Sequence, residues 1–401
     1  MIKKLFLLAC GLVFTGITLG QNDLWRLEIS LNDRLQLPFF IKETVGETKL
    51  EPNTFEVLNG TEKIGLTLKT AHGDSMELAF KEMDSYLKFV YSDSKNIRGY
   101  WRDNRKGITY PITGSKGNYK RFGPTTDTEP KNVFNSYKVL FGDTKNAWPA
   151  VGLFEQTGDQ LTGTFLTETG DYRFLEGNVF GDRLYLSCFD GAHAFVFTAK
   201  IFGDTLRGSF YSGASYKTSW EGVKNETAKI GSPDSLTYLI SDSYNLSELR
   251  FRSLKGFKRK LDFSKTPLTI IQIMGSWCPN CLDETNYFKE IHKQYKEDGL
   301  NIIALGFESQ KTTKKRRKHL KVFAKKAKIP YPVYLAGSAS KKEASQMFSM
   351  LNEISSFPTT LFVNQKGKII YVHTGFYGPG TGAYFERYQI GIRQKIEKCI
   401  K

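Results

Sequence analysis

Hydrophobic and polar residues follow two different patterns along the chain. From Leu24 to about Ile230, short runs rich in Phe, Tyr, Val, Leu and Thr are separated by Gly, Asn and Asp, which is typical of β-strands joined by tight turns. Beyond about residue 250, apolar strand-like runs alternate with segments whose apolar residues recur at helical spacing. The pattern therefore predicts an all-β region followed by an α/β region.

An internal repeat supports a β-meander in the first region. Residues Gly158–Phe165 recur as Gly203–Phe210, and Gly181–Phe189 is a looser third copy. Each copy begins with a Gly-Asp pair and continues as an alternating run, which predicts a turn and a strand once for every two strands. Because long meanders protect their edges by closing or stacking, we expect residues 21–230 to form one barrel or sandwich domain.

The second region predicts a sheet with helices on both faces. Residues 223–250 are rich in Asn, Ser, Asp and Lys, and we predict a linker at residues 231–250. Residues 251–401 follow the order β-α-β-α-β-α-β-β-α. The expected strands are 268–274, 301–306, 332–335, 359–363 and 368–374, and the expected helices are 280–295, 311–328, 341–351 and 384–397.

Composition and charge narrow the class of protein. The 401 residues are 40% hydrophobic with a mean hydropathy of −0.37, which excludes a disordered or fibrous chain and one that crosses a membrane repeatedly. Of the net charge of +16, residues 231–401 carry +15, and residues 311–328 hold ten Lys/Arg without an acid. We interpret this run as a helix with a solvated basic face; docking to an acidic partner or an anionic lipid surface is the alternative, and no nucleic-acid partner is expected.

Residues 1–20 have the pattern of a secretory signal peptide. Lys3 and Lys4 precede an apolar stretch, and small residues stand at the cleavage positions before Gln21. The alternative is a lipoprotein signal with acylation at Cys10. No later segment approaches 18 apolar residues, so we expect an exported protein of the periplasm or cell envelope, with peripheral or lipid-anchored membrane association as the further option.

The segment Gly275–Cys281 carries the clearest chemistry. It contains a CxxC motif directly after an apolar strand and at the start of a helix, a context that indicates redox function. Cys278 would lie at the helix N-terminus, where free N–H groups and the helix dipole stabilise a thiolate. Cys281, one turn later, could resolve a mixed disulfide formed by Cys278.

Other uses of these cysteines are weaker. A structural zinc site needs two further ligands, and no Cys or His pair with suitable spacing exists elsewhere in the chain, so we predict no metal and no cofactor. A peroxiredoxin would need Thr or Ser three residues before its reactive Cys, where Cys278 has Gly275. Cys188 and Cys399 lie in different predicted domains, so we expect both to remain unbridged.

Residues 254–398 resemble the thioredoxin superfamily, and within it the exported TlpA/ResA-like thiol-disulfide oxidoreductases. The matching segments are Trp277–Glu284, Gly306–Ser309 and Phe357–Val363. The β region is similar, more faintly, to the domain that precedes many exported TlpA-like proteins. The resemblance implies a multidomain protein with an N-terminal all-β meander, barrel or sandwich, and a C-terminal α/β thioredoxin fold.

The resemblance also implies site residues. Pro358 matches the family's cis-proline, which places the backbone of the preceding residue beside Cys278, where it would pair with an incoming chain and keep metals off the thiols. TlpA/ResA-like proteins place a Glu three residues after the second Cys, and Glu284 occupies that position as the proton acceptor for Cys281. Thioredoxins proper use a buried Asp where this chain has Gln272. Glu308, at the end of the next strand, is the back-up acceptor.

The function that we expect is an exported thiol-disulfide oxidoreductase that reduces disulfides of client proteins through the Cys278/Cys281 couple. A client protein that contains a disulfide and an upstream membrane thiol donor are the implied partners. The rival interpretation is a β module that binds a ligand or protein, with an accessory thioredoxin-like domain. Cys278 should then lack the low-pKa reactivity that the first function requires.

Overall fold

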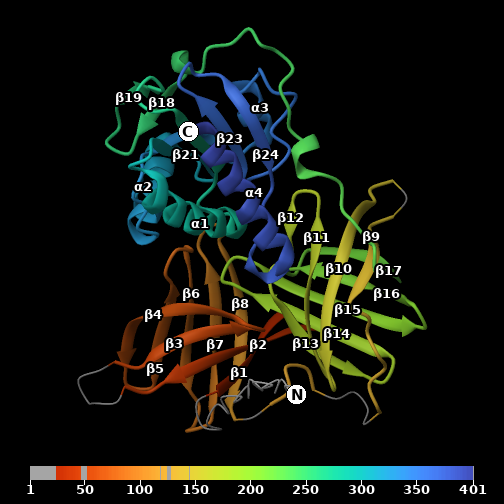
Figure 1. The fold of residues 1–401 in the computed structure, drawn as a ribbon. Helices are drawn as coiled ribbons and strands as arrows, with labels where there is room; N and C mark the ends of the chain where they lie inside the picture. Colours follow the sequence, from red (N-terminus) through yellow and green to blue (C-terminus); the bar gives the residue numbers. More distant parts are fainter. Residues whose placement is uncertain (1–23, 47–51, 118, 124–127, 144, 401) are drawn as a thin grey trace, which may run out of the picture.

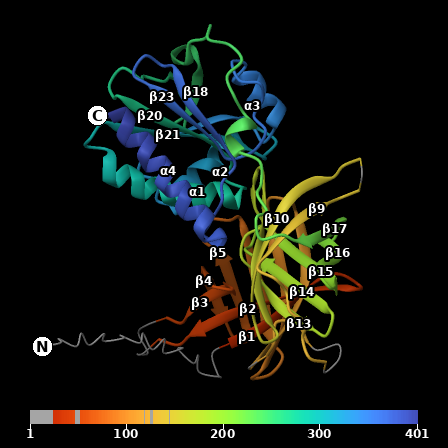
Figure 2. The same cartoon turned by 45° about the vertical axis from the view of Figure 1, so that its right-hand side comes forward.

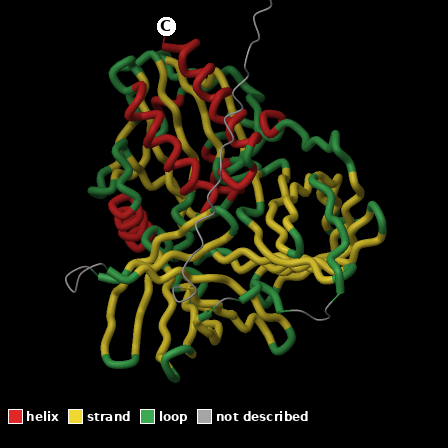
Figure 3. The backbone as a smooth tube through the Cα atoms, turned by 60° about the horizontal axis from the view of Figure 1, so that its bottom comes forward, coloured by secondary structure: helices red, strands yellow, loops and turns green. Residues whose placement is uncertain are grey.

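The computed structural model describes residues 24–46, 52–117, 119–123, 128–143 and 145–400. The predicted signal peptide and Cys10 lie outside the described residues. Figure 1 shows two β units side by side and an α/β unit that lies across them. Seen from below, all the α-helices of the described chain belong to that third unit (Figure 3). Within the described residues, no helix is both long and apolar enough to span a membrane.

The first β unit is a closed barrel of eight antiparallel strands in chain order. The first and last strands pair, with Leu27 opposite Gly114, so no edge is left open. Alternate side chains such as Leu27 and Ile29 point into the apolar core, as the period-2 pattern requires. The strands are β1 (Leu24–Asn32), β2 (Leu35–Thr44), β3 (Thr54–Asn59), β4 (Glu62–His72), β5 (Ser75–Phe80), β6 (Ser85–Tyr91), β7 (Asn96–Asp103) and β8 (Ile108–Lys116).

The second β unit is an antiparallel sheet of nine strands with its own aromatic core. Strand β10 pairs with both β9 and β11, which joins the two ends of the sheet into a ring. The predicted Gly-Asp turns are confirmed, because Gly158, Gly181 and Gly203 have φ of 60°, 53° and 58° and each joins two paired strands. The strands are β9 (Ser136–Phe141), β10 (Trp148–Thr157), β11 (Gln160–Thr167), β12 (Gly170–Asp171), β13 (Leu175–Phe180), β14 (Arg183–Phe189), β15 (Ala194–Phe202), β16 (Thr205–Ser212) and β17 (Tyr216–Lys224).

The all-β prediction is confirmed, but residues 21–230 contain two closed units where a single barrel or sandwich was expected. Buried contacts join them: Arg121 donates to Glu176 at 2.7 Å and to Asn59 at 2.8 Å, and Phe189 packs in the core of the first barrel. Both units have the same period-2 alternation, so the sequence pattern does not mark the division. Their limits as independently folding domains remain a prediction.

The α/β unit is a seven-stranded sheet in the order β19-β18-β22-β21-β20-β23-β24. Helices α1, α2 and α4 cover one face and α3 the other, which confirms the prediction of helices on both faces (Figure 2). The strands are β18 (Arg250–Ser253), β19 (Lys258–Lys260), β20 (Leu268–Met274), β21 (Leu300–Glu308), β22 (Val333–Ser338), β23 (Thr359–Asn364) and β24 (Ile369–Thr374). The helices are α1 (Pro279–Tyr295), α2 (Thr313–Lys326), α3 (Lys341–Met347) and α4 (Ala383–Ile400).

Two local expectations differ from the structure. The predicted linker 231–250 packs against the α/β unit: Leu246 is buried in its core, and the Tyr238 amide donates to Asn352 at 2.8 Å. Its polar composition concealed the few apolar side chains that hold it in place. Helix α3 ends at Met347, before the expected end at residue 351, because Phe348 leaves the helical region with φ −104° and ψ 51°.

Candidate active site

The CxxC motif occupies the turn between β20 and α1. Cys278 is the N-cap of α1, and Cys281 lies in the first turn, with 5.2 Å between their Cα atoms. The two residues form a disulfide, and the Cys281 amide donates to Cys278 Sγ at 3.2 Å. Cys278 is 8% exposed and Cys281 is fully buried, so an incoming disulfide reaches Cys278 first. Cys188 and Cys399 are free, as predicted.

A cis peptide bond lies beside the disulfide. The bond between Phe357 and Pro358 is cis, and the Phe357 carbonyl oxygen lies 3.6 Å from Cys278 Sγ. The ring of Trp277 packs edge-on against that of Phe357 at 5.6 Å, and its indole N–H donates to the Phe307 carbonyl at 2.8 Å. These contacts fix the backbone around the exposed sulfur.

On the inner side of the loop, Glu284 is fully buried in a polar cluster. Gln272 Nε2 donates to its carboxylate at 2.9 Å, and the hydroxyls of Thr360 and Tyr388 donate at 2.8 and 2.9 Å. Burial raises the pKa of Glu284, although these three hydrogen bonds oppose the rise. The same Gln272 nitrogen lies 3.1 Å from the Cys281 carbonyl, so the amide links the carboxylate to the second cysteine.

On the outer side, Glu308 holds the loop of the motif through Ser276. It accepts hydrogen bonds from the amide and hydroxyl of Ser276 at 3.0 and 2.6 Å, and His319 Nδ1 lies 3.3 Å away. His319 Nε2 lies 3.6 Å from Asp84 of the first barrel. Burial lowers the pKa of His319, but hydrogen bonds to Asp84 and Glu308 outweigh it and raise that pKa to about 9. The back-up acceptor thus lies beneath Ser276, as part of a link to the barrel.

The first barrel also contacts the CxxC loop directly. Arg105, just after β7, donates to the Trp277 carbonyl at 2.8 Å, and Trp277 immediately precedes Cys278. Asp103 holds the guanidinium with hydrogen bonds of 3.0 and 2.8 Å, and both side chains are buried. Such a paired, oriented arginine supplies a fixed N–H donor and a positive charge beside the motif.

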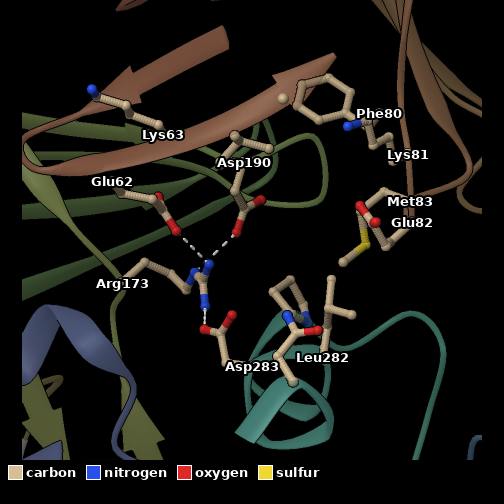
Figure 4. A pocket seen from close by; sticks show the side chains of 14 residues that line it. Glu62, Lys63, Phe80, Lys81, Glu82, Met83, Arg173, Asp190, Leu282 and Asp283 are labelled. Carbon is tan, nitrogen blue, oxygen red and sulfur yellow. Dashed lines mark hydrogen bonds and ion pairs between the residues drawn. The ribbon is translucent and has the colours of Figure 1, made fainter. Parts of the chain in front are cut away.

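A second arginine joins all three units (Figure 4). Arg173 of the second β unit contacts Glu62 of the barrel at 2.7 Å, Asp190 at 3.4 Å, and Asp283 of α1. A cavity of about 290 Å³ lies next to this cluster, between the barrel and the first turns of α1. The active-site helix is therefore anchored to both β units within a few residues of its cysteines.

Four predicted site residues meet at one place, namely Cys278, Cys281, Glu284 and Pro358. Sequence reasoning missed the partners of Glu284: Gln272 was noted only as an exception, and Tyr388 carries no local signal because it comes from the last helix. It also missed Arg105, which lies 172 residues from its partner Trp277. A charge pattern within one strand does not reveal a contact made by packing of separate units.

An α/β sheet with a CxxC pair at a helix N-terminus and an adjacent cis-proline defines a thioredoxin-fold redox domain. Residues 260–382 match the Redoxin family. The C-terminal domain is therefore a Redoxin domain, and it is similar to ResA-type thiol-disulfide oxidoreductases.

Three relatives illustrate the likeness. Thioredoxin-like protein YneN of Bacillus subtilis is 24% identical over 136 residues, 34% of this chain and 73% of that protein. ResA of B. subtilis is 24% identical over 136 residues, 34% of this chain and 69% of its own length. ResA of Halalkalibacterium halodurans is 27% identical over 105 residues, 26% of this chain and about half (52%) of its own length.

Two solved structures align with about the same share of the chain. A putative thiol:disulfide interchange protein DsbE from Chlorobium tepidum has a TM-score of 0.30 at 17% identity, covering 39% of this chain and 96% of its own. StoA from B. subtilis has a TM-score of 0.26 at 20% identity, and the alignment covers 35% of this chain and 93% of StoA.

Proposed function

We propose that the protein is an exported thiol-disulfide oxidoreductase that reduces disulfides of client proteins through Cys278 and Cys281. The observation that carries this proposal is the Cys278–Cys281 disulfide at the start of α1, in which Cys278 is 8% exposed and Cys281 is fully buried. The position of the Phe357 carbonyl and the cis-proline supports an extended client strand beside Cys278. The names of the relatives are consistent with the same chemistry.

The reaction begins with the reduced protein. The Cys278 thiolate, stabilised by the helix N-terminus and the Cys281 amide, attacks one sulfur of the client disulfide. A mixed disulfide forms, and the other client sulfur leaves as a thiolate that takes up a proton. Cys281 then attacks Cys278 Sγ and releases the second client thiol. The client gains two electrons and the protein is left with its disulfide.

Glu284 is the proton acceptor in the second step. Cys281 must lose its proton before it attacks, and Glu284 is the buried carboxylate that Gln272 links to the Cys281 backbone. Because burial raises the pKa of Glu284, the carboxylate takes up a proton more readily than an exposed one. Thr360 and Tyr388 position the carboxylate through hydrogen bonds.

The remaining parts of the proposal concern the cell. Residues 1–20 direct export to the periplasm or cell envelope, by signal cleavage before Gln21 or by acylation at Cys10. A membrane thiol donor returns electrons to the Cys278–Cys281 disulfide, because each reduced client leaves the protein oxidised. The β units serve as a fixed support for the redox domain, which agrees with the contacts that Arg105 and Arg173 make to α1 and its loop.

The test uses the full mature chain in reduced form, mixed with a synthetic peptide that contains one disulfide. The expected result is two client thiols for each protein disulfide formed, and no reaction with Cys278→Ala. A double variant, Cys188→Ala/Cys399→Ala, should react like the wild type, because neither cysteine contacts the site. Equal thiol release by Cys278→Ala and wild type would refute the proposal. Titration in redox buffers would then give the reduction potential that sets the direction of electron flow.

A further inference from the structure

Helix α2 carries a concentration of positive charge that the fold leaves without counter-ions. Residues 311–328 contain ten Lys and Arg. Within the described part of the chain, none of the ten forms an ion pair with a carboxylate. The arginines of the β units behave differently, since Arg105, Arg121 and Arg173 each have a buried or half-buried acidic partner. The charge on α2 is therefore free to meet an external anion.

Part of this charge lines a groove. A cavity of about 370 Å³ lies between α2 and the barrel loop that contains Glu82 and Asp84. Lys315, Lys318 and Lys326 border it, and their spacing of three and eight residues places them along one side of the helix. Its apolar lining consists of Val322, which is 46% exposed, and Phe323, which is only 2% exposed. The groove thus combines a lysine border with an apolar lining.

The acidic residues on the opposite wall do not cancel these lysines. Asp84 is already engaged, because His319 lies 3.6 Å from it and Asn104 donates to it at 3.1 Å. Burial raises the pKa of Glu82, and the nearby charges of Lys81, Lys289 and Lys326 oppose that rise. None of the three lysines forms an ion pair with either acid in the described part of the chain, and Lys326 alone is close enough to lower the pKa of both.

The groove lies close to the redox loop. His319 lines it and also lies 3.0 Å from the hydroxyl of Ser276, two residues before Cys278. A client chain that presents a disulfide to Cys278 is therefore held close to the groove. We infer that the groove between α2 and the barrel loop binds an acidic segment of the client protein, with an apolar residue on Val322.

The inference rests on the proposed function and names its substrate class. Unpaired surface charges accelerate association with oppositely charged partners and do so less as salt is added, since exposed charges are screened within about 10 Å at 0.1 M salt. An acidic client should therefore react faster than a neutral one at low salt, and the difference should shrink at high salt.

The experiment measures single-turnover rate constants for the reduced full-length protein with three peptides. The peptides share one disulfide and differ in flanking residues, which are acidic, neutral or basic. We expect the acidic peptide to react about tenfold faster than the neutral one at low salt. The groove variant Lys315→Gln/Lys318→Gln/Lys326→Gln should bring the ratio of acidic to neutral rates close to one. The matched control Lys341→Gln/Lys342→Gln/Lys366→Gln removes the same charge from exposed positions elsewhere and should keep the ratio.

Each other outcome overturns the inference. An equal fall of the ratio in both triple variants would assign the preference to net charge alone. A wild type without any preference would show that the groove takes no acidic client. If vesicles with anionic lipid retain the wild type but not the groove variant, and the peptide ratio is one, the surface binds a membrane instead. Failure of the proposed function is recognised separately, as the absence of reaction with the neutral peptide.

Discussion

The two sides of the CxxC loop are built from different parts of the chain. On the inner side, Glu284 is held by Gln272, Thr360 and Tyr388, which all belong to the α/β unit. On the outer side, Arg105 of the first barrel contacts the loop directly, and Asp84 is linked to it through His319. The inner side holds a buried carboxylate that can carry a proton, whereas the outer side holds charges at the boundary between units.

The inner side is thus suited to proton transfer, and the outer side to holding the loop against the barrel. The inner cluster should act on proton transfer and be insensitive to how the units pack. The outer contacts should act on the stability of the assembled chain and on the thiolate at Cys278, since they depend on the barrel remaining in place. Three changes test this division.

The largest effect is expected from Glu284→Gln. Loss of the proton acceptor should slow resolution of the mixed disulfide by about 10²–10⁴-fold near neutral pH, since that is the usual contribution of a general base. Stopped-flow measurement across pH should show the deficit shrinking at high pH, where Cys281 ionises unaided. In the wild type the rate should fall as pH drops through the raised pKa of Glu284, because the protonated carboxyl accepts no proton. The control Glu290→Gln changes an exposed acid on the same helix. Equal rates for both variants at every pH would remove Glu284 from the mechanism.

A smaller effect is expected from His319. Burial lowers the pKa of His319, but Asp84 and Glu308 outweigh it and raise this pKa from 6.5 to about 9. The contribution of His319 to the stability of the folded protein is therefore complete below pH 6.5 and is lost as pH rises through about 9. The free energy of unfolding should fall by about 1–2 kcal/mol over that window, after allowance for solvent screening of a partly exposed group. Denaturant titrations of His319→Gln should lack this slope, whereas the exposed His72→Gln should retain it. If His319→Gln retained this pH dependence of the free energy of unfolding, another group would be its cause.

The smallest effect is expected from Arg105. Arg105→Gln removes a donor and a positive charge near Cys278, so alkylation of this thiol at mildly acidic pH should slow by about three- to tenfold. Arg105→Lys keeps a positive charge beside Asp103, so the alkylation rate of Cys278 should fall less than in Arg105→Gln. The control Arg98→Gln removes an exposed arginine of the same barrel strand β7. Alkylation rates that do not differ among the three variants would mean that the barrel has no influence on the thiol.

The inner side was largely predictable from the sequence, and the outer side was not. Cys278 and Cys281 lie at the start of a helix that follows an apolar strand, so local periodicity and spacing are enough to place them, whereas the role of Glu284 came from the resemblance. Pro358 came from the resemblance, because sequence alone favours a trans bond before proline. The strands and helices from β20 to α4 were predicted from local periodicity, with errors at their ends, whereas the short strands β18 and β19 were not predicted.

The contacts that join the units have no local signal. Arg105 and Trp277 are 172 residues apart, and Arg173 and Asp283 are 110 apart, so each pair exists only because folded units pack against one another. The division of the β region into two closed units was missed for a related reason. Strand alternation reports which face of a strand is buried, but not which sheet the strand joins.

The most direct test of the central claim traps the covalent intermediate with a disulfide-containing peptide. In Cys281→Ala, Cys278 can attack but nothing can resolve the product, so mass spectrometry should find a stable adduct of peptide and protein joined at Cys278. In Cys278→Ala, the buried Cys281 should give almost no adduct. Accumulation of the adduct on Cys281 of the Cys278→Ala variant, with none on Cys278 of the Cys281→Ala variant, would contradict the assignment of the attacking thiol.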